Sequence, residues 1–368
     1  MCRWVMTRLS LALFAVFCLS SPAAAAAEAA PQTTAPPAPC VSATNACAEW
    51  LTLGGGPARA MVYRTYPLDT RNVAVRRALI MVHGTLRNAD HYFTTATGAA
   101  FLARALGDTL VIAPAFHSSD PDCGDRLQAN ELSWSCGGDS WRSGGSATSD
   151  PALSSFDFVD AIQRQLANRA LFPNLTTIVI AGHSAGGQLV LRYAVANRVH
   201  DLLGLKVAYV VGNPSSYPWP DANRPAPVDD ADAGKAAAAW ASEAPHTHFQ
   251  FGPFDPAKAP DFDHWPYGLT GRTAGYTKSM TDAQLRAQMT SRPITLLLGQ
   301  VDTFPLGGFD DRPGAMAQGP TRRARGEAFV AYVDGRLGGR IKPIIVPECG
   351  HNDRCVFTSD SVLPLIFP

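Results

Sequence analysis

The sequence predicts an α/β protein with a mostly parallel, twisted sheet flanked by helices. Continuous apolar runs such as ALIMVH (78–83) and TIVIA (177–181) are typical of strands buried on both faces of a parallel sheet. Between these runs lie segments with apolar residues at helical spacing, as in 156–171. Because the two kinds of segment alternate, we expect parallel strands connected by helices.

Six apolar runs are expected to be strands, over 78–83, 109–115, 177–181, 206–211, 294–298 and 341–346. Helices are expected over 88–106, 156–171, 188–199 and 325–337. Two long stretches, 117–151 and about 214–291, interrupt this alternation. The second is rich in aromatic residues, and we interpret it as a cap insertion, because long excursions are usually lids or binding loops. An inert surface decoration is the alternative.

Composition limits the classes of function. The 368 residues suffice for one large domain, and 46% of them are hydrophobic. Lys plus Arg number 31, as do Asp plus Glu, so the formal net charge is zero. This balance argues against nucleic acid as a partner, because such binding neutralises phosphates with many cations. It also argues against a polybasic membrane anchor.

The N-terminus has the pattern of a signal peptide over 1–27. Arg3 and Arg8 precede an apolar run at 11–19, and small residues follow at 20–27. The run is too short to cross a bilayer, so we favour cleavage near 25–27 over a retained anchor. An Ala/Pro/Thr-rich linker is expected over 28–46, and the mature protein is expected to be secreted or periplasmic, without stable membrane insertion.

Cysteine usage fits export. Removing Cys2 and Cys18 with the signal peptide leaves six cysteines. They form three close sequence pairs, so the simplest disulfides are Cys40–Cys47, Cys123–Cys136 and Cys349–Cys355. Metal binding is the alternative, but no C-x-x-C spacing occurs.

Residues 182–186 read GHSAG and match G-x-S-x-G. An apolar strand precedes the motif and an amphipathic helix follows it, which is the strand–turn–helix context that the motif requires. We expect close backbone approach on both sides of Ser184, so that only small residues fit at Gly182 and Gly186. The next amide, of Ala185, would lie at a helix N-terminus, which favours a developing oxyanion.

Four motifs together resemble those of the α/β-hydrolase superfamily: GHSAGG (182–187), VHGT (82–85), LLLGQVD ending at Asp302, and PECGH ending at His351. The resemblance extends from about Cys47 to the C-terminus and favours the exported esterase and poly(3-hydroxybutyrate)-depolymerase-like branches. It implies an α/β-hydrolase fold with a catalytic domain over 47–368. It also implies the triad order Ser184, Asp302, His351.

Each triad role has a physical rationale. Ser184 needs a base within hydrogen-bond reach to act as a nucleophile. His351 follows the last expected strand through a short turn, which puts it at the carboxyl edge of the sheet, where ligands bind in open α/β sheets. His83 is a rival candidate, although in the HG pattern it is normally a structural residue.

Asp302 lies nearest a strand end and is the expected orienting acid, with Asp310 and Asp311 as alternatives. By the family pattern, the backbone N–H groups of Thr85 and Ala185 should form the oxyanion hole. The Thr85 hydroxyl could instead cap a helix.

Other candidate residues are less specific. Aromatic residues could line an acyl or aryl pocket or pack in a core, and the candidates for substrate binding are Trp134, Trp141, Trp219 and Trp265. His246, His248, Asp261, Asp263 and His264 could bind a metal, but solvated loop residues are the favoured interpretation, and we expect no metal. The charged run at 321–325 is interpreted as a solvated helix face.

The sequence therefore predicts an exported serine hydrolase that cleaves small-molecule or polymeric carboxylic esters through an acyl-enzyme, without a cofactor. A polyester depolymerase or an amide hydrolase with the same triad is the alternative. A non-catalytic binding protein with this fold is an alternative of another class.

Overall fold

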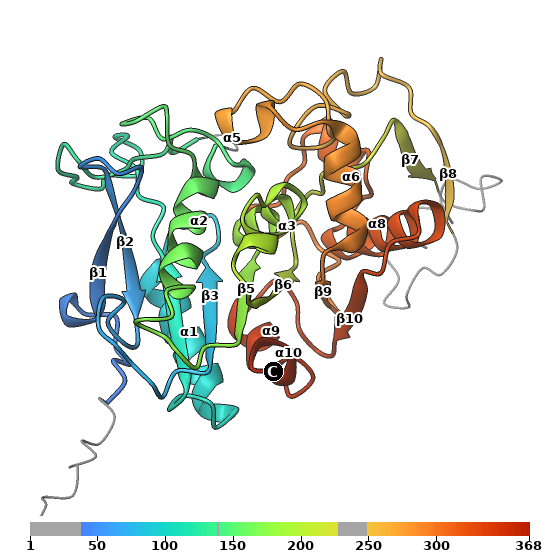
Figure 1. The fold of residues 1–368 in the computed structure, drawn as a ribbon. Coiled ribbons are helices and arrows are strands. Elements are labelled where there is room, and N and C mark those ends of the chain that lie inside the picture. The colour runs from blue at the N-terminus through green and yellow to red at the C-terminus, as the bar shows by residue number, and fades with distance from the viewer. Residues whose placement is uncertain (1–37, 138–139, 227–248) are drawn as a thin grey trace, which may run out of the picture. The chain divides into compact units, whose positions relative to one another are not determined.

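An eight-stranded sheet forms the centre of the molecule, in the order β1-β2-β4-β3-β5-β6-β9-β10 (Figure 1). A computed structural model describes residues 38–137, 140–226 and 249–368 of the chain. The strands from β4 to β10 are parallel, whereas β1 and β2 pair antiparallel to each other and β2 pairs antiparallel to β4. The strands are β1 (Ala48–Thr52), β2 (Arg59–Arg64), β3 (Arg77–Val82), β4 (Thr109–Pro114), β5 (Thr177–His183), β6 (Lys206–Gly212), β9 (Ile294–Gly299) and β10 (Lys342–Val346).

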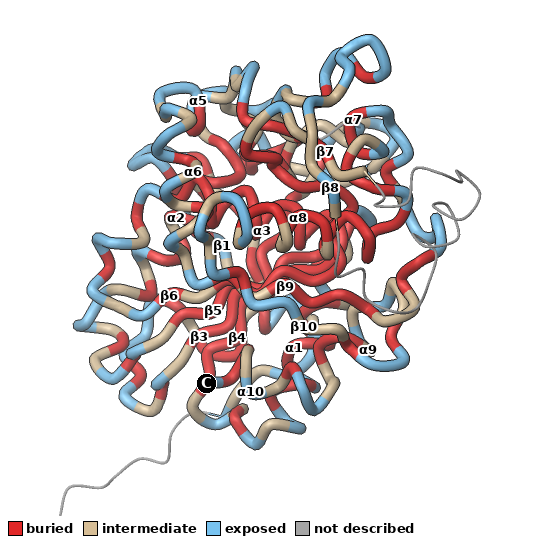
Figure 2. The backbone as a smooth tube through the Cα atoms, turned by 90° about the vertical axis from the view of Figure 1, so that its right-hand side faces the viewer, coloured by how far each residue is buried: buried red, intermediate tan, exposed pale blue. Residues whose placement is uncertain are grey.

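Successive residues of the central strands enter two separate hydrophobic cores. Ile80 and Ile178 belong to one core, whereas Leu79 and Val179 belong to the other. This division follows from the two-residue period of a strand, and both faces must be apolar because helices cover both. The buried residues accordingly follow the central strands in Figure 2. The expected sheet, and all six expected strands, are confirmed.

Different helices cover the two faces of the central sheet. On one face α1 packs on β2, β3 and β4 and also contacts α9 and α10. On the other face α3 packs on β5 and β6, α8 packs on β9 and β10, and α6 contacts both α3 and α8. The helices are α1 (Ala89–Leu102), α2 (Ser155–Leu166), α3 (Ala185–Ala196), α5 (Gly275–Lys278), α6 (Asp282–Ser291), α7 (Pro313–Met316), α8 (Arg322–Leu337), α9 (Asp353–Phe357) and α10 (Leu363–Ile366).

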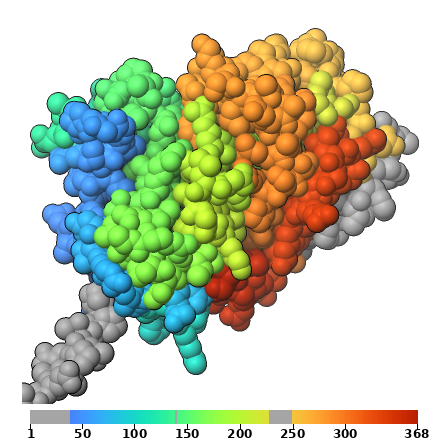
Figure 3. Space-filling view, in the orientation of Figure 1, coloured from blue at the N-terminus to red at the C-terminus, as the bar shows by residue number. Residues whose placement is uncertain are grey.

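The described part of the long insertion after β6 contains regular secondary structure. It includes a two-stranded antiparallel sheet of β7 (Asn223–Ala226) and β8 (Gln250–Pro253), followed by α5 and α6. Figure 3 shows the orange segment that contains α6 packed directly beside the yellow-green α3. Residues 227–248 of the insertion lie outside the described residues. Much of its aromatic content is core, since Tyr217 and Trp219 are fully buried.

The N-terminal part of the domain differs from the expectation. Residues 40–46 were assigned to a linker, but Cys40 donates its backbone N–H to Thr65 O, and the Cys40–Cys47 disulfide closes this segment. The hairpin of β1 and β2 was not predicted, because its strands are half exposed and lack a continuous apolar run. The expected signal peptide lies outside the described residues.

All three expected disulfide pairings are present: Cys40–Cys47, Cys123–Cys136 and Cys349–Cys355. Among the described residues, no helix combines the length and the apolar character that crossing a membrane requires.

A buried carboxylate joins α2 and α3 to the insertion. Asp160 of α2 accepts hydrogen bonds from the hydroxyls of Tyr193, on α3, and Tyr276, on α5. Burial raises the pKa of Asp160 to about 6, although both tyrosine hydrogen bonds act in the opposite direction. The folded protein therefore binds a proton at Asp160 more tightly than the unfolded chain does.

This pKa predicts how stability depends on pH. Since the folded pKa is the higher one, the stability contributed by protonated Asp160 is complete below pH 3.8 and is lost as the pH rises through about 6. Asp160→Asn should remove this dependence. From pH 4 to pH 7 the free energy of unfolding of the wild type should fall relative to the variant by roughly 2.4 kcal/mol. Urea denaturation of both proteins across this pH range measures the difference, and parallel curves would contradict the assignment.

Candidate active site

Ser184 occupies a sharp turn between β5 and α3. Its backbone has φ 58° and ψ −120°, a conformation that L-residues rarely adopt, and the residue is 6% exposed. Its amide donates to Gly212 O at the end of β6, which holds the turn against the sheet. Such strain costs about 1–3 kcal/mol and is common at functional sites.

The predicted close backbone approach around Ser184 is confirmed. A Cβ on Gly182 would lie 2.6 Å from the carbonyl carbon of Gly186. A Cβ on Gly186 would lie 2.3 Å from Val82 O at the end of β3. Two residues beyond the end of β3, a Cβ on Gly84 would lie 3.8 Å from Ser184 Cβ. The segment after β3 therefore passes directly beside the serine.

The three predicted triad residues converge although they are far apart in the sequence. His351 Nε2 lies 2.9 Å from Ser184 Oγ, and His351 Nδ1 lies 2.9 Å from Asp302 Oδ2. Asp302 is 2% exposed, so its carboxylate bonds the imidazole with little competition from water. This hydrogen-bond chain can orient the imidazole and take a proton from the serine hydroxyl.

The alternative acids lie elsewhere. Asp310 is buried, but its carboxylate binds the Arg312 guanidinium and the Tyr267 hydroxyl. Asp311 is exposed. The structure therefore brings Asp302, and neither alternative, to the imidazole.

The segment that carries His351 is anchored on both sides. The Cys349–Cys355 disulfide brackets it. Asn213, just after β6, donates through its side-chain amide to Gly350 O (3.1 Å) and accepts from Gly299 N (2.7 Å). One side chain thus connects the ends of β6 and β9 to the histidine segment. The sequence analysis missed Asn213, whose only signal is its position after a strand.

Two further histidines have structural environments. His83 Nε2 accepts from Phe116 N and its Nδ1 donates to Gly84 O, which holds the segment after β3 in place. Burial lowers the pKa of His83 to about 3, so the ring stays neutral. His183 lies with its ring centroid 4.6 Å from that of His351. Burial, followed by the charges of His351 and Arg322, lowers the pKa of His183 well below its ordinary value.

The expected oxyanion donors lie on the two segments that meet at Ser184. Ala185 is the first residue of α3, where backbone amides lack an acceptor within the helix. Thr85 follows Gly84 beside the serine and lines the same cavity as Ser184. The cap of α1 is Asn88, not Thr85, so the Thr85 hydroxyl does not cap that helix.

The triad opens onto a cavity of about 390 Å³. Besides Ser184 and His351, its walls include a second His–Asp pair that the sequence analysis missed, in which His91 Nε2 lies 3.0 Å from Asp353 Oδ2. The complete lining is Gly84, Thr85, Leu86, Asn88, His91, Tyr92, His183, Ser184, Gly307, Gly308, His351 and Asp353.

The tryptophans expected to bind substrate do not line this cavity. Trp134, Trp141 and Trp219 are at most 4% exposed and belong to the hydrophobic core. Trp265 is half-buried and donates its indole N–H to Ser143 O at 2.7 Å. Core packing, the alternative interpretation, describes their positions.

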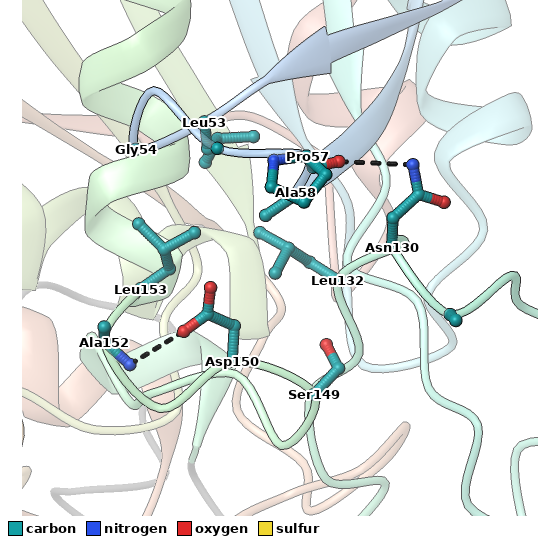
Figure 4. A pocket seen from close by; sticks show the side chains of 12 residues that line it. Leu53, Gly54, Pro57, Ala58, Asn130, Leu132, Ser149, Asp150, Ala152 and Leu153 are labelled. Carbon is teal, nitrogen blue, oxygen red and sulfur yellow. Dashed lines mark hydrogen bonds between the residues drawn. The ribbon is translucent and has the colours of Figure 1, made fainter.

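A second cavity of about 480 Å³ lies beside the turn between β1 and β2 (Figure 4). Leu53, Leu132 and Leu153 line it, and two of its polar side chains make local hydrogen bonds: Asn130 donates to Pro57 O, and Asp150 accepts from Ala152 N. No residue of the triad lines it.

The less specific metal candidates are not brought together. His246 and His248 lie outside the described residues. His264 Nε2 is 3.8 Å from Asp263 Oδ1, and the imidazole is largely exposed. Across the described ranges, no group of three or more His, Cys, Asp or Glu residues is arranged to hold a metal ion.

Comparisons with known proteins agree with the architecture. The model of a family described as the alpha/beta hydrolase family matches residues 79–362. No curated protein matches the chain. Poly(aspartic acid) hydrolase-1 from Sphingomonas sp. KT-1 is similar in structure, with a TM-score of 0.56 and 21% identity over 87% of this chain and 98% of that one. LpqC, a poly(3-hydroxybutyrate) depolymerase from Bordetella parapertussis, has a TM-score of 0.55 and 18% identity over 85% of this chain and 89% of that one.

The packing at the serine turn generates a stability prediction. Gly186→Ala should destabilise the fold by about 3 kcal/mol, because the added Cβ would lie 2.3 Å from Val82 O and 2.4 Å from His83 O, which are backbone atoms of the sheet edge. Gly98→Ala is the matched control, since Gly98 is exposed within α1 and its Cβ would meet no atom within 4 Å. That change should stabilise by about 0.5–1 kcal/mol. Equal stability of the two variants in urea denaturation would contradict the prediction.

Proposed function

Because the chain belongs to the alpha/beta hydrolase family, we propose that it is an exported serine hydrolase that cleaves carboxylic esters through an acyl-enzyme on Ser184. The observation that carries this proposal is the pair of 2.9 Å contacts that connect Ser184, His351 and Asp302. Ser184, at one end of this chain of contacts, lines a cavity large enough for a small acyl or alcohol group.

The reaction follows from these contacts. Ser184 Oγ attacks the ester carbonyl carbon while His351 Nε2 takes the serine proton. The carbonyl π electrons move to oxygen, and the resulting oxyanion accepts hydrogen bonds from the Thr85 and Ala185 amides. When the tetrahedral intermediate collapses, the imidazolium gives its proton to the departing alcohol. A water molecule then repeats the sequence on the acyl-enzyme and releases the acid.

Asp302 has two roles in this sequence. Its hydrogen bond from His351 Nδ1 keeps the Nε2 lone pair directed at the serine, and its negative charge stabilises the imidazolium that forms in each step. It does not need to take up the proton.

The same three side chains can cleave polyesters and amides, because the triad acts on a carbonyl carbon whatever the leaving group. A panel of p-nitrophenyl esters of increasing acyl length, poly(3-hydroxybutyrate) films and peptide amides separates these substrates. Labelling with a fluorophosphonate separates all of them from a non-catalytic binding protein, since only an activated serine reacts.

Export is supported by the apolar leader pattern at 1–27 and by the three disulfides, which form and persist in oxidising compartments. A secreted or periplasmic location follows from this proposal.

Ser184→Ala should abolish ester hydrolysis and fluorophosphonate labelling while the protein still folds. The nucleophile is lost, so only the contribution of binding and the oxyanion amides remains, about 10³–10⁴ over the reaction in water. Steady-state turnover and the circular dichroism spectrum of the purified variant provide the check. Turnover close to that of the wild type would overturn the proposed nucleophile.

Asp302→Asn should lower kcat by about 10⁴, because an amide in place of the carboxylate favours the wrong imidazole tautomer. Asp310→Asn is the matched control, since Asp310 is also buried but binds Arg312 and Tyr267. The control should keep its turnover whatever it loses in stability. The reverse order of the two effects would mean that Asp302 is not the orienting acid.

A further inference from the structure

Three arginines in the first turn of α8 are buried, although the sequence favoured a solvated charged face for this run. Arg322 and Arg325 are fully buried and Arg323 is 2% exposed. Thr321 caps the helix by accepting a hydrogen bond from Ala324 N, so the helix begins at Arg322. Burying a guanidinium is costly unless its N–H groups are satisfied, so the partners of each arginine show what it holds.

Arg322 reaches three segments with one side chain. Its Nη1 lies 3.4 Å from Asp302 Oδ1, its Nε donates to Ser215 Oγ at 2.7 Å, and its Nη2 donates to Gly307 O at 2.9 Å. A guanidinium is planar and directs its donors in fixed directions, so it can set the relative positions of these groups.

We propose that Arg322 is a positioning residue of the triad, which holds Asp302 and the backbone at Gly307 in the arrangement that keeps His351 directed at Ser184. This inference rests on the proposed function and adds a residue that acts through the orienting acid.

The first support is the division of the Asp302 carboxylate between two partners. Its Oδ2 bonds His351 Nδ1, whereas its Oδ1 faces Arg322. Within the described part of the chain, no other side chain bonds this carboxylate. The carboxylate is 2% exposed, so without Arg322 one oxygen would lose its partner in a site with little access to water.

The second support is the position of the Gly307–Gly308 segment. A Cβ on Gly307 would lie 3.2 Å from His351 Cδ2, and a Cβ on Gly308 would lie 3.2 Å from Thr85 Cγ2. The segment thus lies between the imidazole and the expected oxyanion loop, and both glycines line the catalytic cavity. The Arg322–Gly307 hydrogen bond places this wall relative to the acid.

The following residue strengthens the same attachment. The Phe309 ring lies under the guanidinium groups of Arg325 and Arg322, with Cζ–centroid distances of 4.4 and 5.2 Å. Arg325 also donates to Ser215 O and Asp310 O. The first turn of α8 therefore holds both ends of 307–310.

The charge of Arg322 gives a pH signature. His351 faces Ser184, Asp302 and the neutral His183, while His91 and Asp353 line the same cavity. Around Arg322 lie Asp302, Asp310 and Arg325, whose charges act on it. The positive charge beside Asp302 offsets part of the carboxylate's stabilisation of the imidazolium. Removing that charge should therefore move the acidic limb of the activity profile to higher pH.

The test compares Arg322→Met, which keeps an apolar stem but removes the charge and donors, with Arg322→Lys, which keeps the charge. Arg323→Met is the matched control, because Arg323 is the adjacent buried arginine but binds Gln300 O and Glu327. With p-nitrophenyl acetate, we expect Arg322→Met to lower kcat by about 10- to 100-fold with little change in KM, as for a small misplacement of a catalytic group. The acidic limb of its pH–kcat/KM profile should move to higher pH.

Arg322→Lys should keep the acidic limb near that of the wild type. Its kcat should still fall, because an ammonium group cannot reproduce the fixed directions in which the guanidinium donates its hydrogen bonds. Arg323→Met should lower the melting temperature without moving the limb. If Arg322→Met behaves like Arg323→Met, or folds with an unchanged kcat, the proposal is wrong. Should Arg322→Met not fold, Arg322→Lys decides, and a lysine variant equal to the wild type in kcat overturns the proposal.

NMR spectra of labelled histidine imidazoles in the same proteins, recorded at one pH, provide a readout that needs no substrate. A changed signal of the hydrogen-bonded His351 Nδ1–H in Arg322→Met, with no such change in Arg323→Met, supports the positioning role, and an unchanged signal refutes it. If the wild type cleaves no ester of the panel and Ser184 is not labelled by the fluorophosphonate, the proposed function fails, while these spectra still decide the role of Arg322.

Discussion

The site depends on the contact between the backbone of Gly186 and the end of β3. This contact lets the first turn of α3 lie against the sheet edge, and it forces Ser184 into its strained conformation. Because neither Gly182 nor Gly186 carries a side chain, the turn can be tight enough to raise the hydroxyl above the strand ends. The Ala185 amide and the Gly84–Thr85 segment then reach the same point in space. A single Cβ at Gly186 would separate these parts.

The acid side of the site has a different physical basis. Here the hydrogen bonds of buried arginines, not close backbone packing, determine where the segment that carries Asp302 lies. The three arginines in the first turn of α8 donate to main-chain carbonyls of the segments after β6 and β9, such as Ser215 O and Gln300 O. Their hydrogen bonds offset the cost of desolvation, and they also prevent these irregular segments from moving independently. Of the three, Arg322 bonds the carboxylate of Asp302, so the position of that carboxylate depends on Arg322 as well as on the end of β9.

The described residues of the insertion after β6 contribute to the core and do not line the catalytic cavity. Tyr217 and Trp219 are buried, and Tyr276 binds Asp160 between α2 and α3. The cavity walls come instead from short segments at the carboxyl ends of β3, β5, β9 and β10. The aromatic composition of the insertion therefore indicated burial, and composition cannot distinguish an aromatic residue that packs in a core from one that contacts a ligand.

The sequence by itself determined the parallel sheet, the serine turn, the order Ser184–Asp302–His351 and the disulfide pairing. The triad order is implied by the resemblance of four motifs to the α/β-hydrolase superfamily, and the other features depend on local signals: apolar runs, glycines on both sides of a serine, and cysteines close in the chain. Only the tertiary structure decided that Asp302 meets the imidazole, that Trp134, Trp141 and Trp219 are core, and that the charged run at 321–325 is buried. The physical reason is that these outcomes depend on partners 20 to 110 residues away in the chain, such as the carboxylate and carbonyls that satisfy Arg322 and Arg325. A run of charges has the same sequence pattern whether water or the protein itself satisfies it.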